Sequence, residues 1–473
     1  MKSYGIDQGT TSTKLHELEE DGKFRARAHF THAQFYPQPQ WVEHDPLELL
    51  GHVRDAIAAT EENSVIGLAN QGETVMAWDR DTKRPICRAI VWQDARTEEG
   101  IARLKAEGAE AITLARAGLP LDSYFSASKF RWILDHVEEA CTLRREGRLR
   151  LGTSDAFFLD SLAGIFRTDP STASRTSLLN LRTQEWDEEL LTLFGVPREC
   201  LPDIGSSAGT LAEFAQGRRL TASLVDQQAA LFGHGCQRPG QAKITFGTGA
   251  FALAVMGTVP PENGPRGLLP TIAWRIEGEE TVYAVDGGVY NAGSAVDWAQ
   301  QLGLFGDHAE IARFDGESAL ARGLVFVPAL SGLACPYWDR SAAGMWLGMG
   351  LDTSRRDLMQ ALLEGIALRS AQLIAAIETI VPIEGAVSLD GGLADNPYFL
   401  DFLARALDRP LVIPATVDLT AFGAAALARR GAGQPSPPSP PPLRRLDRLP
   451  HALSPGYHHI FLDAVARARG WRT

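Results

Sequence analysis

The chain has 473 residues, of which 45% are hydrophobic and 22% are charged, and its formal net charge is −12. The length allows two large domains or three small ones, and the composition excludes a largely disordered chain. An acidic protein has no general electrostatic attraction for nucleic acid or anionic lipid, so any phosphate must be held by local groups. The five cysteines include no CxxC pair, which argues against a disulfide scaffold and a structural zinc site and favours a reducing, cytoplasmic location. We expect neither a signal peptide nor a membrane span, because no apolar run is long enough.

Short apolar segments that end in glycine-containing turns alternate along the chain with helical patterns. Strands are expected over residues 4–7, 243–246 and 386–389, each followed by a tight turn. Helices are expected over residues 99–118, 126–145, 355–380 and 454–471. This alternation predicts an α/β protein with its ligands at the carboxyl ends of the strands.

A strand followed by a Gly/Thr turn occurs near residue 9 and again near residue 248, which suggests two halves with related plans. We expect the N-terminal domain over 1–236 and the C-terminal domain over 237–473. The proline-rich run at 435–442 cannot form a helix or a central strand. It is interpreted as an extended surface spacer in preference to an SH3-type ligand.

Residues 7–14 combine an aspartate, a glycine, four hydroxyl side chains and a lysine at the end of the first strand. Gly9 permits a tight turn, and the hydroxyl and N–H groups can donate to phosphate oxygens. Asp7 can hold Mg²⁺ through water. A polar hairpin turn without a ligand explains this segment alone equally well. No Walker A or GxGxxG motif is present, so a nucleotide would need another kind of phosphate loop.

Two later turns follow the same logic. Residues 247–251 and 390–396 each place glycines directly after a strand, where the backbone can approach a phosphate, a base or a ribose. Either turn alone is better explained as structure, but three such turns in one chain favour a nucleotide site. Asp226 begins a predicted helix, so it is either an N-cap or a general base beside Gln227.

Aromatic, amide and acidic residues near positions 70–73, 91–94 and 123–125 are of the types that bind polyols. Aromatic faces cover C–H groups, and Glu, Gln and Tyr side chains bind hydroxyls. The spacing does not show that these segments converge, and a core position is the stronger interpretation of Trp92 alone.

In chain order, these motifs resemble those of the FGGY carbohydrate kinases, the family that includes the glycerol kinases. The resemblance covers nearly the whole chain. The segments that carry it are 5–12, 40–46, 90–94, 173–176, 226–233, 247–251, 336–339, 390–392 and 420–425.

The resemblance implies two ribonuclease-H-like domains of the actin/hexokinase type, with polyol and ATP meeting in the cleft between them. It implies that Asp226 is the general base for a terminal hydroxyl and that Asp7 positions Mg²⁺. The implied polyol contacts are Gly72, Glu73, Trp92, Tyr124, Asp226, Gln227 and Phe251. The implied nucleotide contacts are Thr10, Thr11, Ser12, Lys14, Thr248, Gly293, Asp297, Gly392 and Asn396.

Three positions depart from the family pattern. Lys14 stands where an Arg is usual, and Asp297 stands where a Gln often contacts nucleotide. Gly72 replaces an Arg that binds glycerol hydroxyls in glycerol kinases. We therefore expect a roomier pocket that lacks one cation, binds glycerol weakly and could accept a longer polyol or a ketose such as erythritol, xylulose or ribulose.

The leading prediction is an ATP- and Mg²⁺-dependent polyol or sugar kinase, with glycerol and a larger substrate as close competitors. A non-catalytic sensor of nucleotide or sugar would be expected to lack Asp7 or Asp226, and both are present. A chaperone-like or actin-like ATPase would lack the polyol-binding residues. The predicted partners are a small polyol or sugar and no nucleic acid, with a homodimer left open.

Overall fold

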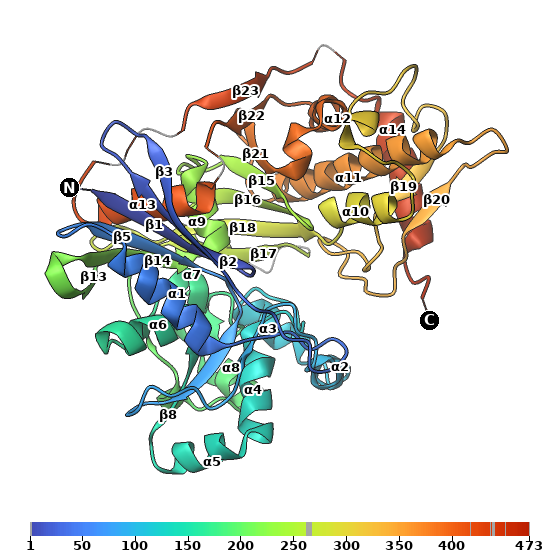
Figure 1. The fold of residues 1–473 in the computed structure, drawn as a ribbon. Coiled ribbons are helices and arrows are strands. Elements are labelled where there is room, and N and C mark those ends of the chain that lie inside the picture. Colours follow the sequence, from blue (N-terminus) through green and yellow to red (C-terminus); the bar gives the residue numbers. More distant parts are fainter. Residues whose placement is uncertain are drawn as a thin grey trace.

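Two mixed β-sheets with related strand plans form the centres of the two halves of the molecule (Figure 1). The computed structural model describes residues 2–261, 267–416, 418–435, 437, 440–449 and 451–472. The first sheet has the order β13-β14-β5-β1-β2-β3. Its strands are β1 (Ser3–Gln8), β2 (Ser12–Leu18), β3 (Phe24–Thr31), β5 (Val65–Asn70), β13 (Ala208–Glu213) and β14 (Arg219–Val225).

The second sheet has the order β17-β18-β16-β15-β21-β22-β23. Its strands are β15 (Ala242–Phe246), β16 (Ala250–Gly257), β17 (Leu269–Trp274), β18 (Val282–Val289), β21 (Val387–Gly391), β22 (Leu411–Pro414) and β23 (Pro442–Leu446). In each sheet the first strand pairs antiparallel with the next strand and parallel with a later one: β1 with β2 and β5, and β15 with β16 and β21. The predicted α/β fold with two related halves is therefore confirmed.

Two helices, α9 (Asp226–Gly233) and α13 (Leu419–Gly431), lie between the two sheets (Figure 1). A Cβ atom on Gly5 of β1 would lie 1.8 Å from the carbonyl oxygen of Ala421, and one on Gly423 would lie 1.8 Å from that of Ala229. The absence of side chains at these glycines thus lets α13, which follows the second sheet in sequence, pack directly on the first sheet and on α9. The predicted division at residues 236 and 237 falls between α9 and β15 and remains a prediction.

The N-terminal half also carries a smaller sheet with the order β4-β7-β6-β8, which lies with several helices below the first sheet in Figure 1. Its strands are β4 (Glu43–His44), β6 (Val75–Asp79), β7 (Ala89–Ile90) and β8 (Leu149–Thr153). The helices of this half are α1 (Pro46–Ala58), α2 (Glu98–Ala106), α3 (Glu110–Arg116), α4 (Ser126–His136), α5 (Glu138–Arg145), α6 (Ser154–Ala163), α7 (Pro170–Ala173) and α8 (Glu188–Phe194).

Two of the helix predictions were wrong in length. The helix expected over 99–118 is divided into α2 and α3, because Gly108 adopts a left-handed φ of 77°. The helix expected over 126–145 is divided into α4 and α5 at Val137, whose backbone is extended. An unbroken apolar pattern does not show a one-residue break of this kind.

The long helix expected over 355–380 is confirmed as α11 (Arg355–Glu378), which begins with a capping box formed by Ser354 and Asp357. Besides α13, the C-terminal half contains α10 (Gly293–Gln301), α12 (Pro397–Leu407) and α14 (Pro455–Ala468), and α14 is the predicted closing helix.

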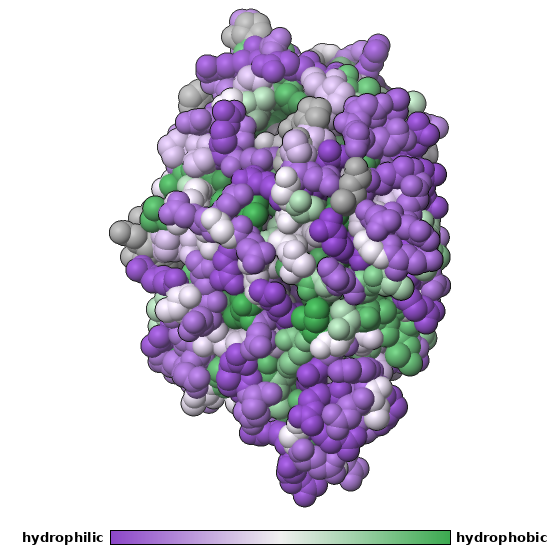
Figure 2. Space-filling view, turned by 90° about the vertical axis from the view of Figure 1, so that its left-hand side faces the viewer, coloured by the Kyte–Doolittle hydropathy of each residue, from purple (hydrophilic) through white to green (hydrophobic). Residues whose placement is uncertain are grey.

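The proline-rich run is described at residues 435, 437 and 440–442, whereas 436, 438 and 439 lie outside the described residues. Pro442 begins the edge strand β23, which pairs with β22, and prolines are tolerated in a sheet at such an edge. On the face drawn in Figure 2, polar side chains cover most of the surface and apolar ones gather in small areas. Within the described part of the chain, no helix combines the length and the apolarity that crossing a bilayer requires.

Candidate active site

The turn between β1 and β2 forms the predicted phosphate hairpin. The N–H of Gly9 donates to the carbonyl oxygen of Ser12 at 3.0 Å, which closes the turn and places Thr10 and Thr11 at its tip. The indole Nε1 of Trp92 donates to the hydroxyl of Thr10 at 3.0 Å. The hairpin is therefore attached to a residue that was predicted to contact the polyol.

Lys14, the cation of the predicted hairpin, is paired in this structure. Its Nζ donates to Asp418 Oδ1 at 2.7 Å, and His16 Nε2 lies 3.0 Å from Asp418 Oδ2. Asp418 is the residue before α13, so this ion pair joins the two halves of the chain. The phosphate contact of Lys14 stays a prediction, and it would require phosphate to share Lys14 with Asp418.

Asp7 and Asp226 both carry carboxylates at the carboxyl ends of strands of the first sheet, in β1 and directly after β14. Burial raises the pKa of Asp7 to about 6. Burial, together with the charges of Asp7 and Glu73, raises the pKa of Asp226 to about 7. The backbone N–H of Gln227 donates to Asp226 Oδ1 at 2.6 Å, which fixes the orientation of the carboxylate. Two neighbouring carboxylates with raised pKa values are an arrangement that a cation would stabilise.

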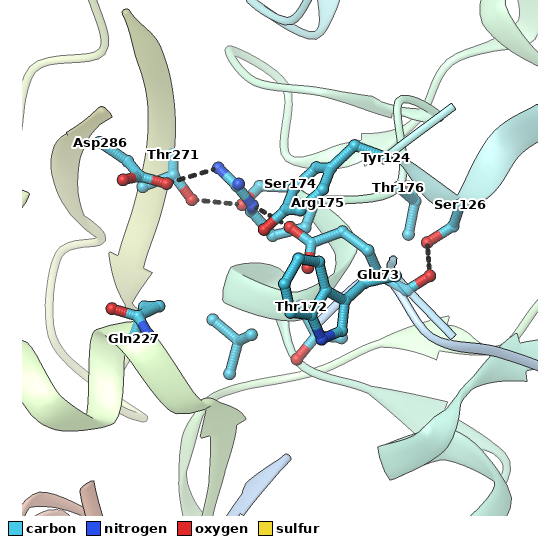
Figure 3. A network of polar contacts seen from close by, with 12 residues as sticks. Glu73, Tyr124, Ser126, Thr172, Ser174, Arg175, Thr176, Gln227, Thr271 and Asp286 are labelled. Atoms are coloured by element: carbon cyan, nitrogen blue, oxygen red, sulfur yellow. Dashed lines mark hydrogen bonds and ion pairs between the residues drawn. The ribbon is translucent and has the colours of Figure 1, made fainter. Parts of the chain in front are cut away.

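A buried ionic network joins Glu73, Arg175 and Asp286 (Figure 3). Arg175 Nε donates to Glu73 Oε1 at 2.6 Å, and Arg175 Nη1 lies 3.2 Å from Asp286 Oδ2. Burial would lower the pKa of Arg175, but Glu73 and Asp286 hold it above its ordinary value. The backbone of Glu73 has a left-handed φ of 55°. This conformation is uncommon for residues other than Gly, and the residues that adopt it cluster at functional sites.

The predicted aromatic residues surround one cavity of about 420 Å³. The rings of Trp92 and Tyr124 meet edge to face with their centroids 5.6 Å apart, and Phe251 contributes from β16 of the other half. Arg175 and Asp286 also line this cavity. Within the described part of the chain, Asp286 Oδ1 is buried without a hydrogen-bond partner, so it can accept from a bound hydroxyl.

Lys129 supports the aromatic wall from behind. It is fully buried, and its Nζ donates to the carbonyl oxygen of Tyr124 at 2.7 Å and to that of Trp92 at 3.4 Å. Burial lowers its pKa to about 8, although Glu73, Asp94 and Asp122 act in the opposite direction. The sequence analysis assigned no role to Lys129, Arg175 or Asp286. For Lys129, the sequence did contain one indication of a special role, which is a charged residue among the apolar positions of the predicted helix.

The space directly beside Gly72 is occupied. A Cβ atom at Gly72 would lie 2.7 Å from Cγ2 of Val225, the residue that precedes Asp226. Both residues are buried, so the side chain of Val225 occupies the space next to the Gly72 backbone. Val225 thus fills the space directly beside the Gly72 backbone, whereas the roomier pocket expected where the rest of an arginine side chain would lie stays a prediction.

A second cavity, of about 680 Å³, lies in the C-terminal half beside the turn between β15 and β16. The five nucleotide contacts predicted in this half all line it: Thr248, Gly293, Asp297, Gly392 and Asn396. Asn396 caps α12 by accepting from the N–H of Phe399 at 2.9 Å, so its side chain already has a structural role. The three glycine turns of the sequence thus lie at the carboxyl ends of central strands, in the phosphate hairpin and at this cavity.

The structure thus combines two halves built on related sheets with two separate cavities, of about 420 Å³ and about 680 Å³. Residues 3–233 match the N-terminal domain of the FGGY family of carbohydrate kinases, and residues 242–432 match its C-terminal domain. The chain belongs to this family. It is therefore an enzyme of the carbohydrate kinase class, which transfers a phosphoryl group from ATP to an alcohol group.

Among similar proteins, a glycerol kinase of Citrifermentans bemidjiense is 43% identical over 90% of both chains. A glycerol kinase of Thermus brockianus is 39% identical over 98% of both chains. The crystal structure of Plasmodium falciparum glycerol kinase with ADP superposes with a TM-score of 0.87 at 27% identity, covering 98% of this chain and 97% of the other. Xylulose kinase structures share the fold at lower identity; the one from Rhodospirillum rubrum has a TM-score of 0.84 at 22% identity.

Proposed function

We propose that this enzyme phosphorylates a terminal hydroxyl of glycerol, with ATP and Mg²⁺. The observation that carries the proposal is the position of Asp226, a carboxylate that begins α9 and feels the charges of both Asp7 and Glu73. Relatives named glycerol kinase at up to 43% identity support glycerol as the substrate. The packing of Val225 against Gly72 weakens the reason to favour a larger polyol or ketose, and the relatives do not favour one either.

Asp226 acts as the general base in this mechanism. A pKa near 7 suits a base that works at neutral pH, because it is ionised and still accepts a proton readily. The N–H of Gln227 holds Oδ1, which leaves Oδ2 for the substrate hydroxyl. As the hydroxyl oxygen attacks the γ-phosphorus of ATP, its proton passes to Asp226, and ADP leaves.

The polyol is held between aromatic and polar groups. Trp92, Tyr124 and Phe251 line the cavity and cover the C–H groups of the polyol, while Asp286 accepts from its hydroxyls. Glu73, which is bound by Arg175, is a further acceptor. Arg175 keeps Glu73 in place and can itself donate to a hydroxyl. Since Asp286 and Phe251 come from the C-terminal half, closing the two halves around the polyol completes the site and excludes water, the competing acceptor.

The nucleotide is expected in the cavity of about 680 Å³, with its phosphates directed toward the hairpin of residues 10–12. Asp7 fits a magnesium site: a single carboxylate, with water and phosphate oxygens as the other ligands, is the usual environment of Mg²⁺ in kinases. Bound there, the ion would neutralise phosphate charge. In the described part of the chain, no cluster of three or more potential ligands forms a metal cage, which agrees with an ion shared with the substrate.

The function is tested by measuring ADP release with glycerol, erythritol, xylulose and ribulose as acceptors. We expect the highest kcat/KM with glycerol. Asp226→Asn should lower kcat roughly 10²–10⁴-fold while ATP binding is retained, because only proton transfer is removed. A higher kcat/KM with a ketose, or normal turnover of Asp226→Asn, would contradict the proposal.

A further inference from the structure

Lys243 is a fully buried cation in β15, four residues before the turn that borders the nucleotide cavity. Burying an ammonium group costs several kcal/mol unless charges and acceptors surround it. Nothing in the mechanism above uses this residue, and the sequence analysis gave it no role. Its contacts therefore need an explanation of their own.

Two acceptors bind the Lys243 ammonium group. Its Nζ donates to Gln227 Oε1 at 2.6 Å and to Thr245 Oγ1 at 2.9 Å. An ammonium group can only donate, so it binds the oxygen of the Gln227 amide and not the nitrogen. Gln227 Nε2 must then point away from Lys243. Because Gln227 is only partly buried, this orientation leaves its N–H₂ group as a donor for a molecule in the cleft (Figure 3).

Polar groups also reach the turn at residues 390–396. Thr245, which accepts from Lys243, is the cross-strand neighbour of Asp390 in β21, and Asp390 directly precedes Gly391 and Gly392. His234, just after α9, lies 3.5 Å from Asp390 and 2.7 Å from the hydroxyl of Ser388. Polar contacts thus connect α9, β15 and β21, which carry the base and two of the nucleotide turns.

Burial lowers the pKa of the Lys243 ammonium group, and the charges of three acidic groups act in the opposite direction: Asp390 of β21, Asp286 of β18 and Asp226 of α9. Two of them, Asp226 and Asp286, belong to the active site. A side chain that only filled space would not need acidic residues around it. The acidic residues around Lys243 are expected if its ammonium group holds charged site residues in position.

We propose that Lys243 is a positioning residue for the acceptor substrate, which orients the Gln227 amide and ties the base-bearing helix to the strand that leads to the nucleotide turn. This inference rests on the proposed kinase function. If it is correct, replacing Lys243 weakens polyol binding through Gln227 and changes the affinity for ATP less.

The test is a double-mutant cycle in the full-length enzyme, with KM for polyol and KM for ATP measured separately. We expect Lys243→Met to raise KM for the polyol at least tenfold and KM for ATP less than threefold. In a Gln227→Ala background, the same substitution should change KM for the polyol less than about twofold, because its target is already gone. Additive effects in the cycle would overturn the proposal and indicate a general structural role.

Two further variants keep the test decisive if Lys243→Met does not fold. Gln227→Glu retains an acceptor for Lys243 but loses the outward N–H₂ donor, so KM for the polyol should rise about tenfold. An unchanged KM in Gln227→Glu would also overturn the proposal. Thr245→Val is the matched control: it removes the other acceptor of Lys243 and should raise KM for the polyol less than threefold.

Measuring the activity of the unmodified enzyme distinguishes a failure of this inference from a failure of the proposed function. If it phosphorylates none of the acceptors, the proposed function fails. If it phosphorylates one of them, the cycle is measured with that acceptor, and its result then concerns Lys243 alone.

Discussion

The indole nitrogen of Trp92 donates a 3.0 Å hydrogen bond to the hydroxyl of Thr10, so the wall of the proposed polyol cavity and the tip of the proposed phosphate hairpin hold each other in place. Trp92 lines the smaller cavity but not the nucleotide cavity of about 680 Å³. This one contact therefore connects the regions assigned to the two substrates.

Trp92→Phe retains an aromatic ring and removes the N–H donor. We expect KM for ATP to rise roughly 2–10-fold, as well as KM for the polyol, because a hydrogen bond of this kind contributes about 0.5–1.5 kcal/mol. Steady-state kinetics with each substrate varied in turn measure both effects. Trp132→Phe is the control, since Trp132 packs on Trp41. A change in KM for the polyol alone would show that the contact with Thr10 carries no coupling.

The packing of Gly72 against Val225 predicts the result of restoring an arginine. Gly72→Arg alone should lower kcat/KM for glycerol and destabilise the protein by about 1–3 kcal/mol, because its Cβ would lie 2.7 Å from a Val225 methyl group. Adding Val225→Ala removes this methyl group and should recover activity. Glycerol kinetics and thermal unfolding of both single variants and the double variant test this. Increased activity of Gly72→Arg alone would mean that the space beside Gly72 is open after all.

The network of Glu73, Arg175 and Asp286 makes a prediction about stability. Arg175→Met leaves two buried carboxylates without their cation and should lower the free energy of unfolding by about 3–5 kcal/mol. Arg131→Met is the matched control, because the Arg131–Asp135 pair is exposed and should contribute less than about 1 kcal/mol. Denaturant unfolding of the two variants compares these losses. Equal losses would show that the buried network does not stabilise the fold.

Asp226 should make stability depend on pH in the absence of ligands. Its pKa is about 7 in the folded protein, against 3.8 for the unperturbed group, so the folded state binds the extra proton between these values. Stability contributed by this group therefore falls as pH rises from about 4 to 7. Asp226→Asn does not ionise, and we expect it to be more stable than the unmodified enzyme at pH 8 by about 1 kcal/mol or more.

Thermal unfolding of ligand-free protein at pH 5 and pH 8 measures this difference. The advantage of Asp226→Asn should be larger at pH 8, where the carboxylate is charged. An advantage that is the same at both pH values would mean that the pKa of Asp226 is not raised.

Much of the fold was predictable because it depends on local signals. Gly9, Gly247 and Gly391 follow apolar runs, and each marks the end of a strand as expected. The long helix α11 was found from its apolar spacing. The break between α4 and α5 was missed, because Val137 is neither Gly nor Pro and so does not mark a helix end in the sequence, although its backbone is extended.

The candidate site was predictable in its residue types but not in its contacts. Asp7, Asp226, Trp92 and Tyr124 were candidates by residue type, and the family resemblance implied their roles, which stay predictions. Arg175 appeared only within a family motif, and Lys243 appeared only as the first residue of a predicted strand. A buried cation is recognised by what surrounds it, and the surrounding acids come from elements far apart in the sequence.

The sequence by itself determined the class of the protein, because the order of the glycine turns and the family motifs are local features of the chain. Only the tertiary structure decided that Val225 fills the space beside Gly72, that Lys14 is paired with Asp418, and that Lys243 holds Gln227. The partners in these pairs lie between 16 and 404 residues apart, and side-chain volume and charge are matched only when the folded chain brings them into contact.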